Sequence, residues 1–335
     1  MAQSVSHNAN DTDRQSEPKK SDKRKFFQKF QPLLQGLEVT RVEKNKNYQW
    51  RKKAVSIASL VILPILGYVD YLLNFIYLTG GDDAFSFTVV YLGAAYWWMS
   101  APKRQYKKAY KDTILPKIAN ALNLTYDRKR KISMSEMRQS KVVPGHDRYK
   151  SEDFFEGSYK GARLEFAEIN LEEKRRSKRR TYYVSVFKGL AVLIDLDDKN
   201  FAGHTILVKD SAAFFEFFKE KGYGLDKADL VDPGFEKIFD VYTDDQVEAR
   251  YLVDPLMIQR LKKLHRIYHG KQLMCAFYNT NKVLILIESD HNHFEPPKID
   301  RKATNIREVM RLKKEVFQIL KIIDYLKLYS PDHAE

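Results

Sequence analysis

The chain is poor in cysteine. Its 335 residues include a single one, Cys275, which excludes an intrachain disulfide and a zinc site built from several cysteines. Cys275 lies in the apolar run 273–277, and this setting predicts a core residue and not a nucleophile. One thiol is in keeping with a reducing compartment such as the cytoplasm.

The sequence also lacks the short motifs that mark common enzyme sites. It contains no Gly-x-Ser-x-Gly elbow, no glycine-rich phosphate loop and no His-Glu-x-x-His zinc motif. Asp290, His291 and His293 offer metal ligands at short spacing, but no further ligand pair accompanies them, so we predict a polar loop. We therefore predict no catalytic residue, no cofactor and no metal.

Acidic residues are outnumbered, since 58 Lys and Arg face 44 Asp and Glu and leave a net charge of +14. Such a balance favours an anionic partner, either nucleic acid or the inner leaflet of a membrane. No stacking platform or groove-reading helix accompanies it, so nucleic acid is the weaker interpretation. The densest basic run lies between two predicted strands and comprises Lys174, Arg175, Arg176, Lys178, Arg179 and Arg180. It is either a contact for anionic lipid headgroups, with Ser177 as a phosphorylation switch, or a solvated loop.

What the sequence has in excess is a block of apolar residues between positions 54 and 101. Residues 54–78 are long enough to cross a hydrocarbon core of about 30 Å, and residues 84–101 are near the lower limit. Lys and Arg flank this block on both sides, whereas the turn between the two spans carries two Asp and no basic residue. The positive-inside rule then predicts a multi-pass membrane protein with both termini in the cytoplasm.

Two polar residues, Asp70 and Asn74, lie within the first predicted span. Charged residues are costly there, so Asp70 is either an ion or proton site or a structural residue near the outer interface. One acidic residue in a two-helix hairpin makes no pathway by itself, which favours the structural interpretation.

The remaining organisation is predicted from hydrophobic periodicity. Residues 1–25 are polar and predicted to be disordered, and residues 26–53 form a basic amphipathic juxtamembrane segment. Residues 102–335 form a cytoplasmic α+β domain with a mainly antiparallel sheet, flanking helices and a C-terminal helix at 306–329. The individual segments are strands at 154–159, 162–169, 181–187, 190–196, 237–242, 272–279 and 282–288, a loop at 127–149, and helices at 211–221 and from Asp254 to about 269.

The acidic stretch 243–250 admits two interpretations. Asp244, Asp245 and Glu248 could supply a carboxylate pair for acid–base chemistry. They could equally cap a short helix that begins at Thr243 or Asp244, and capping is the simpler use.

The run 235–252 and the proline at 255 resemble a bacterial membrane family named domain of unknown function 3137. Residues 187–190, residues 201–205 and the apolar pair ahead of the domain add to the resemblance, which covers about residues 103–288. It implies a bacterial inner-membrane protein and transfers no catalytic residue. We predict a non-enzymatic, membrane-anchored interaction module, with a membrane-anchored enzyme acting on a lipid or anionic metabolite as the alternative.

Overall fold

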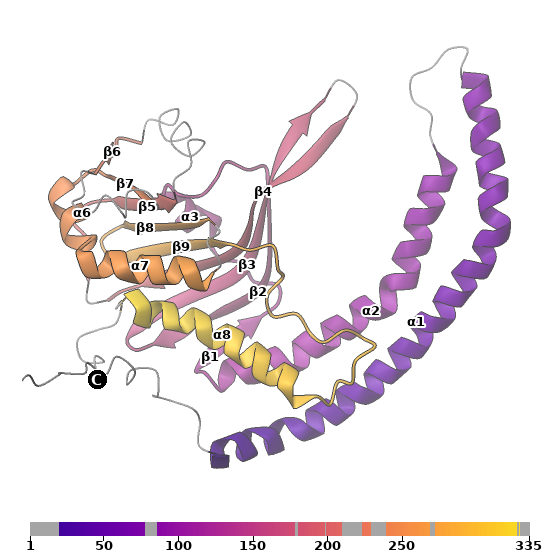
Figure 1. The fold of residues 1–335 in the computed structure, drawn as a ribbon, viewed down its shortest axis with the longest axis horizontal. Coiled ribbons are helices and arrows are strands. Elements are labelled where there is room, and N and C mark those ends of the chain that lie inside the picture. Colours follow the sequence, from indigo (N-terminus) through magenta and orange to yellow (C-terminus); the bar gives the residue numbers. More distant parts are fainter. Residues whose placement is uncertain are drawn as a thin grey trace, which may run out of the picture. The chain divides into compact units, whose positions relative to one another are not determined.

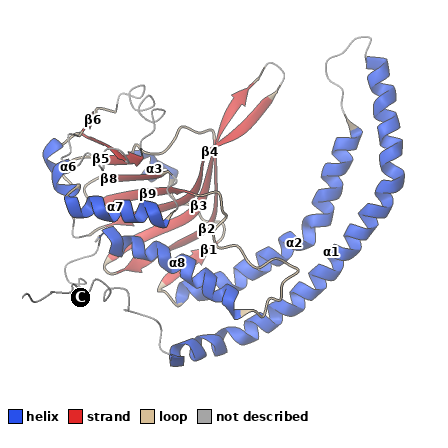
Figure 2. Ribbon diagram, viewed as in Figure 1, coloured by secondary structure: helices blue, strands red, loops and turns tan. Residues whose placement is uncertain are grey.

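The computed structural model describes residues 20–77, 86–177, 180–197, 199–209, 223–228, 239–268, 272–326 and 328. The chain divides into two compact units, Met1–Ala109 with Pro297–Glu308 and Tyr110–Pro296 with Val309–Glu335, and not at position 101. All described strands belong to the second unit (Figure 2). The predicted α+β class with a large antiparallel sheet and flanking helices is confirmed.

Helix α1 (Lys20–Tyr77) joins segments that the sequence treats separately. The tail predicted to be disordered up to residue 25 is helical from Lys20, because no Gly or Pro separates these helix-forming residues from the segment that follows. Residues 1–19 lie outside the described part. Within the described residues, α1 is the one helix that is long and apolar enough to cross a bilayer, because its part Gln28–Leu73 contains a stretch with a mean hydropathy of 1.9.

Helix α2 (Phe87–Asn120) begins three positions later than the predicted second span, and residues 78–85 lie outside the described part. Only the 16 helical residues 87–102 therefore precede the first basic residue, Lys103, whereas a span needs about 20 mainly apolar residues. The first predicted span is supported and the second is not.

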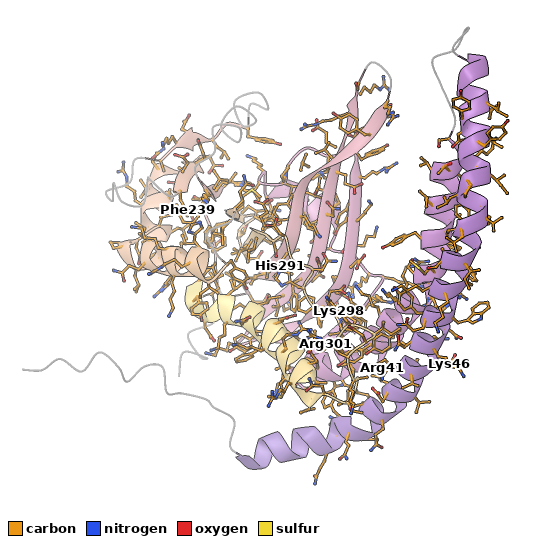
Figure 3. The ribbon with its side chains drawn as sticks, turned by 45° about the vertical axis from the view of Figure 1, so that its right-hand side comes forward. Arg41, Lys46, Phe239, His291, Lys298 and Arg301 are labelled. Atoms are coloured by element: carbon orange, nitrogen blue, oxygen red, sulfur yellow. The ribbon has the colours of Figure 1, made fainter. Side chains whose placement is uncertain are left out.

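Helices α1 and α2 run antiparallel to each other and share hydrogen bonds along their length. Arg51 donates from Nη1 to the carbonyl oxygen of Trp98 at 2.8 Å, and its guanidinium lies 4.7 Å from the centre of that indole ring. The hydroxyls of Ser59 and Tyr91 are 2.9 Å apart. The segment 297–308 contacts α1: Arg41 donates to the carbonyl oxygen of Ile299 at 2.8 Å, and Figure 3 shows Lys298 and Arg301 of this segment near Arg41.

The second unit is built on one antiparallel sheet in the order β1-β2-β3-β4-β9-β8-β5-β7-β6 (Figure 1). Its central strands are apolar at successive positions, which is the pattern of a sheet covered on both faces. The strands are β1 (Leu124–Asp127), β2 (Arg148–Tyr159), β3 (Ala162–Arg176), β4 (Thr181–Asp195), β5 (Thr205–Lys209), β6 (Asp226–Lys227), β7 (Phe239–Thr243), β8 (Leu273–Tyr278) and β9 (Lys282–Glu288).

Strand β4 corrects the prediction of two strands at 181–187 and 190–196 with a turn at Gly189. The chain passes straight through Gly189, which pairs with Ile169 on one side and Glu288 on the other. A Cβ added at Gly189 would lie 2.0 Å from the carbonyl oxygen of Ile287. Glycine is therefore required here by close approach of the neighbouring strand, and not by a turn.

Four further helices pack in the second unit: α3 (Met134–Gln139), α6 (Gln246–Leu252), α7 (Pro255–Ile267) and α8 (Ile306–Leu326). Helix α3 and the start of β2 fall in the stretch predicted to be a loop. Asp254 caps α7 as expected, accepting from the amide of Met257 at 2.6 Å. Helices α7 and α8 lie across one face of the sheet (Figure 1). Helix α8 ends at Leu326, earlier than the predicted 329, and the helix predicted at 211–221 lies outside the described residues.

Candidate functional site

The acidic stretch at the start of α6 holds backbone amides. Asp245 is the N-cap of α6, one residue later than predicted, and its Oδ1 accepts from the amides of Val247 at 2.9 Å and Glu248 at 3.0 Å. Asp244 Oδ1 accepts from the amide of His204 at 2.6 Å. All three carboxylates of the stretch accept hydrogen bonds from backbone amides, since Glu248 binds the amides of Ala202 and Gly203.

Glu248 holds the loop that precedes β5. Its Oε1 accepts from the amide of Ala202 at 2.6 Å, and its Oε2 accepts from the amide of Gly203. A Cβ at Gly203 would lie 2.7 Å from Asp244 Oδ1, so only glycine allows the loop to approach this closely. The arrangement is a clamp that fixes loop 201–204 on α6, and it leaves no carboxylate pair for acid–base chemistry.

A pocket of about 560 Å³ opens beside this clamp. Helix α6, the first half of α7, the loop after β4, strand β8 and the end of α8 supply its walls. Its lining residues are Lys199, Asn200, Phe201, Glu248, Arg250, Tyr251, Leu252, Asp254, Met257, Arg260, Phe277, Leu326 and Leu328. No local sequence pattern indicates this pocket, since its walls come from five separate segments.

The comparisons with known proteins bear on this part of the chain. Residues 185–328 match the family model described as "Protein of unknown function (DUF3137)". This DUF3137 match supports the predicted resemblance, although it begins later and extends further than the predicted 103–288. Every residue that lines the pocket lies inside the DUF3137 match.

Comparisons with curated proteins and with solved structures add no functional assignment. No curated protein matches the chain. A solved structure described as the crystal structure of the mycobacterial trehalose monomycolate transport factor A, TtfA, is similar with 11% identity and a TM-score of 0.31, covering 66% of this chain and 94% of that one. A similarity at this score carries no argument about function.

The basic run lies outside the DUF3137 match, on a two-stranded hairpin formed by the ends of β3 and β4. Strand β2 pairs with β3 only as far as Glu172, so residues 173–177 and 180–184 project beyond the rest of the sheet (Figure 1). Lys174, Arg175, Arg176 and Arg180 are exposed there, and Lys178 and Arg179 lie outside the described residues.

Two contacts involve charged side chains at this hairpin. Arg175 pairs with Glu173 at 3.2 Å, and Arg148 lies 3.2 Å from the centre of the Tyr183 ring. Tyr182, beside the run, is 48% exposed. The hairpin therefore presents an aromatic side chain next to its basic residues.

Asp70 accepts hydrogen bonds from the start of α2. Its carboxylate accepts from the Ser86 hydroxyl at 2.8 Å and from the amides of Phe87 at 2.9 Å and Thr88 at 3.1 Å. The two amides belong to the first turn of α2, where backbone N–H groups have no partner within the helix, and a carboxylate caps such groups well. This contact supports the structural interpretation of Asp70; the side chain of Asn74 lies outside the described part.

A buried ion pair that the sequence did not indicate joins α2 to the sheet. Lys111 Nζ lies 2.6 Å from Asp153 and 3.2 Å from Glu295, and Asp153 also accepts from the Tyr126 hydroxyl at 2.6 Å. Burial alone would lower the pKa of Lys111, but the carboxylates of Asp153 and Glu295 outweigh it and raise that pKa. Asp153 has a φ of 54° at a β-bulge. The residues come from α2, β1, β2 and the loop before α8, so no local sequence pattern predicts the pair.

Glu168 is a second buried acid, 7% exposed, on β3. Burial raises its pKa to about 8, and its carboxylate accepts from the amide of His293 at 3.1 Å. Burial also lowers the pKa of His293. Within the described ranges, no group of three or more His, Cys, Asp or Glu side chains is arranged to hold a metal ion, and His293 is instead half-buried against the sheet.

Proposed function

We propose that the chain is a non-catalytic interaction module anchored in the bacterial inner membrane by α1 and α2. The observation that carries this proposal is the contrast within the chain between exposed apolar side chains on α1 and fully engaged carboxylates at the DUF3137-like motif. Ile57 is 69% and Leu60 77% exposed, which in water would be a costly surface.

The proposed topology has two spans with both ends in the cytoplasm. Arg51 and Trp98 would mark the inner interface, since Arg and Trp side chains favour the headgroup region. Helix α2 is short for a span, and local bilayer thinning and snorkelling of Lys103 and Arg104 would accommodate it.

In this topology Asp70 lies at the outer interface. It follows Arg51 by about 19 residues, or about 28 Å of helix, which is close to the whole hydrocarbon thickness of about 30 Å. Its role there is to cap α2, and this engagement of the Asp70 carboxylate argues against a proton or ion path through it.

The basic hairpin is proposed to contact anionic lipid headgroups. Each basic residue near an acidic leaflet contributes about 1 kcal/mol, and the exposed Tyr182 would lie at the headgroup level. The alternative of a membrane-anchored enzyme needs a free acid–base pair, and the engagement of Asp244, Asp245 and Glu248 argues against it.

The hairpin can be tested with the full chain because its one cysteine, Cys275, is fully buried. A Ser177→Cys variant carries one reactive thiol for an environment-sensitive dye. In nanodiscs containing phosphatidylserine, we expect a blue-shifted emission that is absent in phosphatidylcholine and is lost above about 0.5 M salt.

A matched control replaces the basic residues of the hairpin with Gln in the same labelled background. The proposal fails if the emission is the same in both lipids, or if the Gln variant retains the full shift.

A further inference from the structure

The pocket beside α6 has an apolar floor. Phe201 and Phe277 pack edge to face with ring centroids 5.4 Å apart, and Leu326 and Leu328 are buried nearby. Its volume of about 560 Å³ lies within the range of about 300–1,000 Å³ that holds small ligands. An apolar portion of a ligand could therefore leave water in this pocket.

The rim of the same pocket is basic. Lys199, Arg250 and Arg260 line it together with two carboxylates, Glu248 and Asp254. Both carboxylates are committed to the chain, Glu248 to loop 201–204 and Asp254 to the first turn of α7.

Two of the rim cations are available. Across the described ranges, no hydrogen bond or ion pair engages the side-chain nitrogens of Lys199 or Arg260. Arg260 is half-buried, so part of its side chain is already held against the pocket wall. An anion bound at the rim could accept charge-assisted hydrogen bonds from both cations.

We propose that this pocket binds an organic phosphate that carries an apolar tail, with the phosphate on Arg260 and Lys199 and the tail against Phe201 and Phe277. The phosphate can belong to a soluble metabolite or to a lipid headgroup, and the experiment below distinguishes these two sources. The proposal does not depend on the lipid contact of the basic hairpin, which lies on other strands.

The first test is calorimetric titration of the full chain in phosphatidylcholine nanodiscs with hexyl phosphate, with the heat from empty nanodiscs subtracted. We expect saturable binding, with inorganic phosphate and hexyl maltoside each binding at least about tenfold more weakly. Equal binding of hexyl maltoside would overturn the proposal, because the rim cations would then contribute nothing.

Substitutions locate the site. Arg260→Gln should weaken hexyl phosphate binding about tenfold or more, and adding Lys199→Gln should weaken it further. Arg138→Gln is the matched control, since Arg138 is exposed on α3 and does not line the pocket. Protection of Cys275 from a thiol reagent confirms that each variant is folded. Unchanged affinity in a folded Arg260→Gln protein would refute the site.

Competition between hexyl phosphate and phosphatidic acid distinguishes the two sources of the phosphate. In nanodiscs that contain phosphatidic acid, loss of hexyl phosphate binding to the wild-type protein but not to empty discs supports the site with a lipid as its ligand. Undiminished binding supports the same site with a soluble phosphate as its ligand.

Discussion

The two units of the chain differ in what keeps their apolar residues from water. On α1, Leu60 and Val61 are 77% and 62% exposed. On β8, every residue is buried between neighbouring strands and the helices that cover the sheet. In the proposed topology the first unit therefore depends on a bilayer that the protein does not supply, whereas the second contains its own core. A substitution in the sheet should cost the same in any medium, and one in the helix pair should depend on the surrounding lipid.

The largest effect is expected from Gly189→Ala. Its Cβ would meet the carbonyl oxygen of Ile287 at 2.0 Å, so β4 and β9 would have to separate, at a cost of about 3 kcal/mol or more. The rate at which a thiol reagent reaches Cys275 on β8 measures this loss. Gly36→Ala is the control, because its new Cβ meets nothing within 4 Å and should stabilise α1 by up to about 1 kcal/mol. Equal Cys275 protection in the two variants would contradict the account of β4.

The next effect is expected at the buried ion pair. Lys111→Met leaves Asp153 buried and unpaired, which should cost about 3–5 kcal/mol by the same thiol measurement. A Lys111→Met, Asp153→Asn double variant removes the charge and keeps a residue that tolerates positive φ, so it should recover much of the loss. A double variant that is less stable than Lys111→Met would show that the loss of stability does not come from the unpaired charge of Asp153.

Glu168 should make the stability of the sheet unit depend on pH. The pKa of Glu168 is raised by burial to about 8 in the folded chain, whereas it is near 4.5 when unfolded, so the unfolded state loses its proton first. Its contribution is then complete below pH 4.5 and declines as the pH rises toward 8, by a few kcal/mol at most. Glu168→Gln should flatten this decline and be more stable than the wild type at pH 8. Parallel pH profiles of the two proteins would rule out this origin.

The smallest effect is expected from Asp70→Ala. Losing the cap of α2 should cost about 1 kcal/mol and increase hydrogen exchange at Phe87 and Thr88 without affecting Cys275. Asp70→Asn keeps one acceptor oxygen and should show about half the effect. Abolished ion movement in vesicles with unaltered exchange at these amides would instead favour a transport role.

Sequence periodicity predicted the α+β class, the hairpin of β8 and β9 and the Asp254 cap, because each depends on residues close together in the chain. It placed a turn at Gly189, where the glycine is required by a strand almost 100 positions later. The same limit hid the pocket and the Lys111–Asp153 pair, which are assembled from distant segments. The acidic stretch was assigned to capping, with the cap one residue later than predicted, but its hold on loop 201–204 depends on contacts across 40 or more positions.

The Glu248 clamp has a kinetic consequence for the neighbouring pocket. Phe201 directly precedes backbone amides that are already fixed by two hydrogen bonds to one carboxylate, so this wall is in place before any ligand arrives. A preorganised wall avoids the entropy loss of ordering a loop on binding. Hexyl phosphate should then associate in a single phase whose rate rises linearly with its concentration. Glu248→Gln, which weakens the clamp, should introduce a slower, concentration-independent phase.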